Sequence, residues 1–330
     1  EIDGGANRLP TNTVVTANGN GELRLFGGNQ TIGGLQGIGI VGSEQGSAAR
    51  TLTIDVTNAA GAYNFGGTIR NRNAQGGGAV NLVKNGPGTQ ILSGTNRYSG
   101  TTVVNGGTLL ATHELAFPRY TNLTTQTGPN YKNMTANANG TLAVRGGRAN
   151  EWLSDQIDNF MTNANFNAGS YFGIDVDTGQ TFTYGSAISN GVGYSSVRGF
   201  AKSGAGVLNL TGNLDVPEDV EVRQGQLNVS GPVVRGDELR LLDSSTARVL
   251  GPLTLFNIAS TTNGSTLIVS NTAALAVFGT LTNRGTTTLE GASNLVGLIA
   301  GEAGTINVRG NYTGASNVIL NGGADINFGI

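Results

Sequence analysis

The sequence contains no cysteine, which excludes both a disulfide framework and a thiolate metal site. Charged residues are scarce, at 12% of the 330 residues, and the 19 basic residues are scattered along the chain. Binding to a nucleic-acid backbone needs a clustered basic surface, so the composition predicts no nucleic-acid partner. The sequence has no run of about 18 apolar residues, which predicts no transmembrane segment in this chain.

The chain begins at Glu1 and not at Met, which predicts a processed or trimmed mature protein. Asn, Thr and Ser take the surface positions that Lys and Glu usually fill, so we expect a surface that holds water through uncharged hydrogen bonds. The lack of cysteine is also common in proteins that are exported across a bacterial outer membrane. These features favour an extracellular or cell-surface location.

Glycine is abundant, with 54 residues, and it separates short segments in which apolar and polar residues alternate. Two of these segments align without a gap at an offset of 118 positions (202 − 84 = 118). The first copy spans residues 80–111 and the second spans residues 200–231. The aligned positions of the first copy are Lys84, Gly86, Gly88, Leu92, Gly94, Val104, Gly107 and Leu109, and those of the second are Lys202, Gly204, Gly206, Leu210, Gly212, Val222, Gly225 and Leu227.

Each copy has the pattern of strand, glycine turn, strand and glycine turn, so neither copy can bury both of its faces alone. This pattern predicts an all-β protein built as one continuous β-solenoid over residues 1–330. Residues 112–148 contain two prolines and the only histidine, and they predict a loop excursion from the solenoid. Residues 149–166 predict a helical insertion whose apolar stripe covers the core, because apolar residues recur there at helical spacing. The stripe consists of Leu153, Ile157, Phe160, Met161 and Ala164, preceded by Trp152.

The first copy resembles the autotransporter-associated β-strand repeat. The similarity lies in Lys84-x-Gly-x-Gly, in Ile91 to Gly94, in Tyr98-x-Gly100 and in Val103 to Leu109, and the second copy shares much of it. The resemblance implies a right-handed parallel β-helix, of the kind that outer-membraned bacteria display or secrete as passenger domains. The repeat is defined by architecture and export, so it implies no catalytic residues.

One short motif points to a metal. Asp175, Asp177 and Gly179 form D-x-D-x-G, a spacing that directs two carboxylates toward one cation, as in the first half of a calcium loop. The acid that would close such a loop is missing, so a solvated turn is the alternative. Calcium at Asp175 and Asp177 is therefore the only cofactor that the sequence suggests.

Other candidate sites each have a simpler structural explanation. Gly37 to Gly42 matches G-x-G-x-x-G, but no helical pattern follows it, as dinucleotide binding would require. His113 beside Glu114 lacks a positioned serine for acyl transfer, which favours a loop histidine. The remaining candidates are two carboxylate pairs that could cleave glycosidic bonds, Asp155 with Asp158 and Glu218 with Asp219, and five tyrosines that could grip polysaccharide if exposed, Tyr98, Tyr120, Tyr131, Tyr171 and Tyr184.

The sequence thus predicts an extracellular, non-catalytic β-solenoid with a structural or adhesive role and no enzyme activity. We expect it to self-associate end to end into a filament or surface layer, because the two ends of a solenoid expose unpaired backbone groups. Surface polysaccharide and other cell-surface components are further expected partners. The alternative function is that of a β-helix that binds or cleaves polysaccharide.

Overall fold

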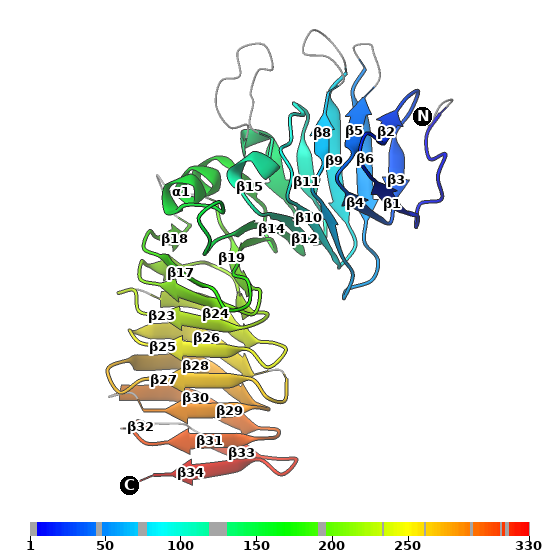
Figure 1. Cartoon of the computed structure of the whole chain (residues 1–330). Helices are drawn as coiled ribbons and strands as arrows, with labels where there is room; N and C mark the ends of the chain where they lie inside the picture. The colour runs from blue at the N-terminus through cyan, green and yellow to red at the C-terminus, as the bar shows by residue number, and fades with distance from the viewer. Residues whose placement is uncertain are drawn as a thin grey trace. The chain divides into compact units, whose positions relative to one another are not determined.

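A computed structural model describes residues 5–43, 48–71, 78–118, 131–190, 196–232, 234–260, 262–290, 293–310, 312–313 and 317–329. The chain divides into two compact units. Unit 1 comprises residues 1–145 and 150–171, and unit 2 comprises residues 146–149 and 172–330. Both units consist mainly of short strands, as Figure 1 shows.

In unit 1 the strands form three parallel stacks, one for each side of the coil. The first stack contains β1 (Val14–Ala17), β4 (Gly34–Gly37), β7 (Ala62–Phe65), β10 (Thr89–Leu92), β12 (Gly107–Ala111) and β14 (Gly140–Arg145). The second contains β3 (Gln30–Ile32), β6 (Arg50–Asp55), β9 (Val80–Asn85), β11 (Thr102–Val104), β13 (Met134–Ala136) and β15 (Asn165–Phe166). The third contains β2 (Glu22–Leu25), β5 (Ile40–Ser43) and β8 (Thr68–Arg70).

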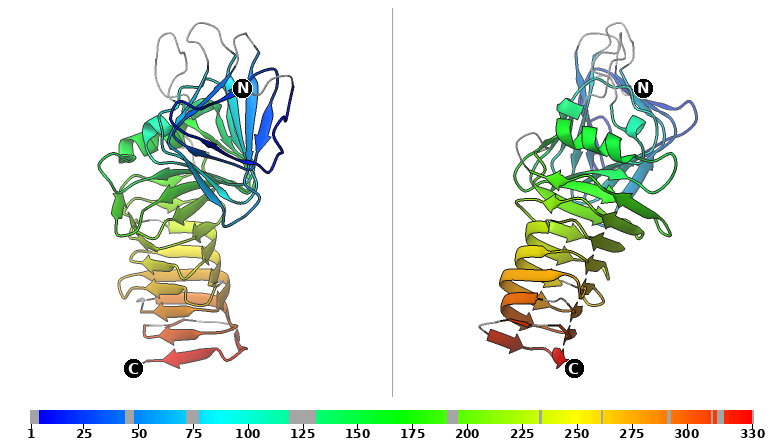
Figure 2. Two further views of the ribbon diagram at one scale, coloured as in Figure 1. Left: turned by 45° about the vertical axis from the view of Figure 1, so that its right-hand side comes forward. Right: turned by 90° about the vertical axis from the view of Figure 1, so that its left-hand side faces the viewer.

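In unit 2 successive coils lie over one another, which the yellow, orange and red strands show in all views of Figures 1 and 2. One side of the coil contains β17 (Thr181–Tyr184), β20 (Val207–Leu210), β23 (Gln226–Val229), β25 (Thr246–Val249), β27 (Thr266–Val269), β29 (Thr286–Leu289), β31 (Thr305–Val308) and β34 (Asp325–Phe328). The remaining strands of this unit pair along the other sides. They are β18 (Ile188–Ser189), β19 (Gly199–Ser203), β21 (Leu214–Asp215), β22 (Val220–Val222), β24 (Val234–Leu241), β26 (Leu253–Ser260), β28 (Ala274–Asn283), β30 (Ser293–Gly301), β32 (Tyr312–Thr313) and β33 (Asn317–Leu320).

Columns of apolar side chains form the core of unit 2. Leu210 of β20 pairs with Val229, which pairs in turn with Val249, Val269 and Leu289 of the following coils. All five side chains are buried. The alternation of buried and exposed residues along each strand follows from the two-residue period of a β-strand, which sends successive side chains to opposite faces. Residues of the same phase therefore stack from coil to coil.

These observations confirm the predicted fold class, a right-handed parallel β-helix with one short helix. Short strands lie between the glycine turns, as the repeat pattern predicts, for example β10, β27 and β29. A single continuous solenoid over the whole chain stays a prediction, because the two units are described separately.

The predicted loop excursion over 112–148 needs correction in its second half. β13 and β14 lie within it and pair in parallel with β11 and β12, so they belong to the coils. The segment looked irregular because β13 is short and its turn contains Asn139 in a left-handed conformation, with a φ of 66°. Residues 112–118 contain the 3-10 helix η1 (Glu114–Ala116), the 3-10 helix η2 (Tyr131–Asn133) follows, and residues 119–130 lie outside the described part of the chain.

The helix α1 (Ser154–Asn163) occupies part of the predicted insertion at 149–166. Its residues Ile157, Phe160 and Met161 are buried, as the apolar stripe predicted. Leu153 is an exception, because it precedes the first turn and 54% of its surface is exposed. The backbone N–H of Leu153 donates to Gln156 Oε1 at 3.0 Å, which satisfies a helix-start donor that has no partner within the helix.

A core substitution tests the stacked columns. Leu267→Ala in β27 should lower the free energy of unfolding by about 2–5 kcal/mol, because it removes a fully buried side chain and leaves a cavity between neighbouring coils. Denaturant unfolding followed by circular dichroism measures the change. The matched control is Thr266→Ala, which alters an outward-facing neighbour and should change stability by about 0.5 kcal/mol or less. Equal losses for the two variants would contradict the assigned phase of β27.

Candidate functional site

The most unusual feature of the core is a lysine at the end of one strand in each repeat copy. The chain has three lysines, and two of them, Lys84 and Lys202, have side chains with 0% exposed surface. Lysine is almost never fully buried unless its ammonium group is paired. Each of these two side chains must therefore find hydrogen-bond acceptors inside the turn.

Both ammonium groups bind backbone carbonyls of two successive coils. Lys84 Nζ donates to the carbonyl oxygens of Asn85 at 2.7 Å, Gly86 at 2.8 Å and Gly106 at 3.1 Å. Lys202 Nζ donates in the same way to Ser203 at 2.8 Å, to Gly204 and to Gln224 at 3.1 Å. The residue offsets of the acceptors are identical in the two copies. We call each arrangement a lysine corner.

The glycine that follows each lysine makes the corner possible. Gly86 and Gly204 have φ angles of 72° and 71°, a left-handed conformation that glycine adopts without steric cost. A Cβ atom at Gly86 would lie 2.4 Å from the carbonyl oxygen of Val56, and one at Gly204 would lie 2.3 Å from that of Val176. The Lys-x-Gly motif thus turns the chain tightly against the preceding coil.

Burial lowers the pKa of both lysines to about 8 from the usual 10.5. A carboxylate on the preceding coil opposes this shift in each case, Asp55 for Lys84 and Asp175 for Lys202. Asp175 also accepts a hydrogen bond from Ser203 Oγ at 3.1 Å. Each lysine corner therefore places one ammonium group among main-chain carbonyl oxygens of two coils and near a carboxylate of a third coil.

An amide performs a related role later in unit 2. Asn283, at the end of β28, is fully buried, and its Nδ2 donates to the carbonyls of Gly285 and Ala303 at 3.0 Å each. Its Oδ1 accepts from Thr287 Oγ1 at 2.9 Å. These contacts again join a turn to the following coil, without a buried charge.

The proposed calcium ligands lie close together in sequence but contact different groups. Asp175, which ends β16 (Tyr171–Asp175), is buried near Lys202. Asp177 forms an ion pair with Arg148, with 3.1 Å between Oδ2 and Nη2. Within the described residues, no group of three or more His, Asp or Glu side chains is placed to hold a metal. Calcium binding by Asp175 and Asp177 stays a prediction, for which a lower melting temperature in chelator is the test.

The glycine motif at residues 37–42 lies in strands. β4 ends at Gly37, and β5 (Ile40–Ser43) follows directly, so the motif opens a strand. The phosphate-binding form of this motif requires a helix N-terminus at that position. The arrangement agrees with the expectation from sequence that the match has no nucleotide-binding context.

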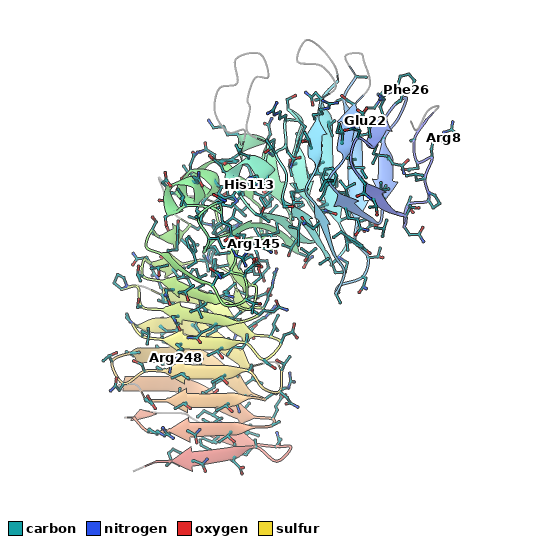
Figure 3. The ribbon with its side chains drawn as sticks, viewed as in Figure 1. Arg8, Glu22, Phe26, His113, Arg145 and Arg248 are labelled. Carbon is teal, nitrogen blue, oxygen red and sulfur yellow. The ribbon has the colours of Figure 1, made fainter. Side chains whose placement is uncertain are left out.

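His113, labelled in Figure 3, lies near the start of η1, and its Nε2 is 3.1 Å from the carbonyl oxygen of Ser93. The adjacent Glu114 contacts the amide of Gln156 in α1, with 3.2 Å between Oε2 and Nε2. Trp152 is buried, and its Nε1 donates to the carbonyl of Ala111 at 3.1 Å. These contacts attach α1 to unit 1, as the expected packing role of the helix requires.

Five aromatic side chains form a cluster under α1. Their ring centroids lie between 5.1 and 6.3 Å apart, in edge-to-face, tilted and stacked arrangements. The members are Phe117, Tyr131, Trp152, Phe160 and Phe166, and all are buried. The helix therefore covers a small aromatic core of its own.

The suggestion that tyrosines grip polysaccharide is wrong for three of the five. Tyr98, Tyr131 and Tyr184 are buried, with 0–1% of their surface exposed. Tyr98 OH lies 2.7 Å from Thr102 Oγ1, and burial raises the pKa of its phenol. Tyr171 is partly exposed, and Tyr120 lies outside the described residues. The residues next to the three buried tyrosines in the sequence did not indicate that their rings point into the core.

Of the two carboxylate pairs, Glu218 with Asp219 has the more perturbed environment. Burial raises the pKa of Asp219, the nearby Arg240 lowers it, and Glu238, Asp237 and Glu221 raise it further. Arg240 Nη2 lies 3.2 Å from Asp219 Oδ2, and Arg198 Nε lies 4.0 Å from Glu218 Oε1. Asp155 and Asp158 lie on α1, where Thr162 Oγ1 donates to the carbonyl of Asp158 at 2.8 Å.

Two surface features of the structure were not predicted from the sequence. A ladder of asparagines runs along unit 1, in which Asn105 donates to Asn85 at 3.0 Å, Asn137 to Asn105 at 2.7 Å and Asn167 to Asn137 at 2.7 Å. In unit 2, Phe256 and Phe278 are 62% and 61% exposed on neighbouring strands. The asparagines lie at or after strand ends at corresponding turns, and each phenylalanine follows a buried apolar residue in the strand alternation, so the sequence contains a signal for both features.

Comparison with known proteins agrees with this architecture. The family of passenger-associated transport repeats matches residues 82–111, which hold the first lysine corner. The chain is also 31% identical over 165 residues to the adhesin BmaC autotransporter of Brucella suis biovar 1 (strain 1330). The aligned region is 50% of this chain and 4% of that protein. No solved structure matches the chain.

The repeat resemblance predicted from sequence is thus confirmed, as is a location outside the cell or at its surface. Among the described residues, no helix has both the length and the apolar character needed to cross a membrane.

The lysine corner predicts a large loss of stability on substitution. Lys202→Met should lower the free energy of unfolding by about 2–4 kcal/mol, because it leaves buried carbonyl oxygens without their donor. Denaturant unfolding measures the loss. The exposed Lys132 provides the control, since Lys132→Met should be nearly neutral. A Lys202→Met protein as stable as the wild type would refute the structural role of the ammonium group.

The lowered pKa also predicts a pH dependence. Between pH 8 and 10.5 the unfolded chain keeps the proton of Lys202 and the folded chain loses it, so the wild type should gain stability relative to Lys202→Met as pH rises through this window. Unfolding free energies of both proteins at several pH values measure the difference. A difference that stays constant or shrinks from pH 8 to 10.5 would mean that the folded protein does not lower this pKa.

Proposed function

We propose that the chain is a non-catalytic adhesive segment of a surface-exposed protein, in which a stiff β-helix presents side chains to other surfaces. The main support is the passenger-type repeat at residues 82–111 together with the similarity to an autotransporter adhesin. The aligned region covers only 4% of that adhesin, so the binding activity of this chain is our proposal and does not follow from the similarity alone. The fold suits the role, because within each unit parallel coils hold outward side chains at a regular spacing.

The uncharged surface is the second support. Asparagine ladders and outward threonines satisfy each other with hydrogen bonds along the coils, as Asn228 does with Asn209 at 2.7 Å. Only 12% of residues are charged, so contacts made by most of this surface should depend weakly on salt. Such a surface is suited to broad, hydrated contact with polysaccharide and other cell-surface components.

Adhesion is tested with beads that carry the folded chain. Coated beads should bind to host-type cell surfaces or immobilised matrix components more strongly than beads coated with the same chain after heat denaturation. Retention under flow measures the difference. Equal retention of folded and denatured coatings would overturn the adhesive function.

We further propose that copies of the chain join end to end. Support comes from the parallel ladder itself, because a coil with no neighbour on one side leaves main-chain donors and acceptors that a strand of another copy can pair. Light scattering at rising concentration should show assemblies, and protein that stays monomeric throughout would contradict the proposal.

Glycan cleavage is the second candidate function, and one observation favours it. The raised pKa of Asp219 beside Glu218 is a property of general acids that protonate a glycosidic oxygen. Incubation with neutral and acidic polysaccharides, followed by detection of reducing ends, tests it. Product release that Asp219→Asn abolishes would replace the non-catalytic function with an enzymatic one, and the adhesive proposal expects no product.

A further inference from the structure

Two phenylalanines stand out on the surface of unit 2. Phe256 of β26 and Phe278 of β28 are 62% and 61% exposed. Their ring centroids lie 6.3 Å apart and the ring planes are inclined by 51°. Exposed aromatic side chains are costly in water, and two that face the solvent side by side suggest a binding surface.

The fold places both rings outward. The residues directly before them, Leu255 and Val277, are buried at 1% and 0% exposure, so strand alternation turns Phe256 and Phe278 to the solvent. Pairing of β26 with β28 shifts in register between Leu255 and Ile258, and the next pair of strands shifts after Val277. These shifts mark a bend in each strand, and the two rings project from it.

The next coil leaves the pair uncovered on one side. Gly297 of β30 approaches the backbone so closely that a Cβ atom there would lie 2.5 Å from the carbonyl oxygen of Phe278. A side chain at this position would require the corner to open. The backbones of β28 and β30 are therefore in close contact next to Phe278, and its ring stays exposed to solvent.

An exposed carboxylate lies on the other side. Gly236 pairs with Leu255 and Glu238 with Asn257, so Asp237 of β24 occupies the coil next to Phe256. Neighbouring strands are about 4.8 Å apart, which brings Asp237 within reach of a group bound to the ring. Asp237 is exposed and forms no ion pair within the described part of the chain, whereas the adjacent Glu238 pairs with Arg240 at 2.8 Å.

The surroundings of Asp237 carry a net negative charge. Asp237, Glu238 and Glu221 all raise the pKa of Asp219, and the two arginines that pair with these carboxylates, Arg240 and Arg223, offset only part of the charge. A positively charged group is therefore the favoured ligand beside the two rings, because it would meet both the aromatic faces and an excess of carboxylate. A neutral sugar could donate a hydroxyl hydrogen bond to Asp237, but it would gain nothing from the net negative charge.

The size of the surface limits the occupant. Two phenylalanines of this exposure offer roughly 200–300 Å² of apolar surface, since an aromatic side chain buries about 150–250 Å² in full. A stable protein interface needs about 800 Å² from each partner. The pair is thus too small for a dimer of this chain and has the size for one side-chain end group.

We propose that Asp237, Phe256 and Phe278 form a binding site for a single arginine or lysine side chain of a partner protein. A cation within about 6 Å of a ring centroid is attracted by the ring quadrupole, and a group seated between the two rings can satisfy this distance for both. The Asp237 carboxylate supplies the opposite charge. This inference rests on the adhesive function proposed above and names its ligand chemistry.

A single contact of this kind is weak, and strong adhesion would require many such contacts at the same time. Many copies of the chain on one surface would engage many basic side chains at once, and multivalent attachment exceeds the single-site affinity by orders of magnitude. The contact also differs from the rest of the surface in its dependence on salt, since it relies on charge.

The experiment uses the whole chain and two small probes. N-acetyl-arginine amide is titrated into the protein and followed by NMR, with N-acetyl-citrulline amide as its uncharged isostere. Arginine should bind and citrulline should bind more weakly, and added salt should weaken arginine binding. Phe256→Leu and Phe278→Leu, which keep an apolar side chain, should each lower arginine affinity about two- to fivefold, as expected for loss of about 0.5–1 kcal/mol of cation–π energy.

Matched variants complete the test. Asp237→Asn should lower arginine affinity and its salt dependence, whereas Phe328→Leu, at an equally exposed phenylalanine of β34, should change neither. Melting curves establish that each variant is folded. Equal binding of arginine and citrulline, or affinity unchanged in Phe256→Leu and Phe278→Leu, would overturn the site.

Other occupants give different outcomes that would also overturn it. A neutral oligosaccharide that binds the wild type and not Phe278→Leu, at an affinity independent of salt, would assign the rings to a glycan. Concentration-dependent association that Phe278→Asp abolishes would assign them to a second copy. Failure of the site is distinct from failure of the proposed function: beads coated with the double leucine variant would then adhere as the wild type does, whereas loss of the function means that wild-type beads do not adhere.

Discussion

Hydrogen bonding between parallel strands in register is the constraint on which the rest of this structure depends. Each coil donates to and accepts from the coils beside it, and side chains of the same phase fall into columns as a consequence. A shift of one residue would turn every buried side chain of a strand to the solvent. The register therefore decides at once which residues form the core and which are presented to other molecules.

The lysine corners act at the points where register is most easily lost. At a turn, main-chain carbonyls leave the ladder, and Lys84 and Lys202 bind three of them each from inside the core. Burying a charge is costly, but removing the ammonium group alone would leave these carbonyl oxygens without their donor. The group donates to carbonyls of two successive turns and so holds one turn against the next. Asn283 makes a similar link without the charge.

Sequence reasoning could predict the architecture because repetition and alternation are both written in the residues. The offset of 118 positions identified two copies whose lysines have equivalent contacts in the structure. Burial of these lysines was not predicted, although Val80, Leu82 and Lys84 alternate in phase along β9 and this phase places the lysine inward. The alternation therefore indicates an inward lysine, but lysine usually lies on the surface, and so its burial was not expected.

Other features depend on contacts that a sequence does not display. The burial of Tyr98 and Tyr184 follows from the path of the coil around them. Asp175, which the sequence offered as a calcium ligand, lies beside a lysine 27 positions away (202 − 175 = 27). In each case the deciding neighbour comes from another coil, and its identity requires the register.

The absence of cysteine allows a direct test of that register. Asn209 and Asn228 face outward as partners on β20 and β23, whereas Asn209 and Gln226 are offset by two residues. A disulfide requires Cα atoms within about 7 Å, which strand partners satisfy and residues offset by two do not. Oxidation should therefore cross-link the Asn209→Cys/Asn228→Cys protein rapidly and leave the Asn209→Cys/Gln226→Cys protein reduced. Equal cross-linking of the two proteins, or preference for the offset pair, would contradict the stacked parallel coils.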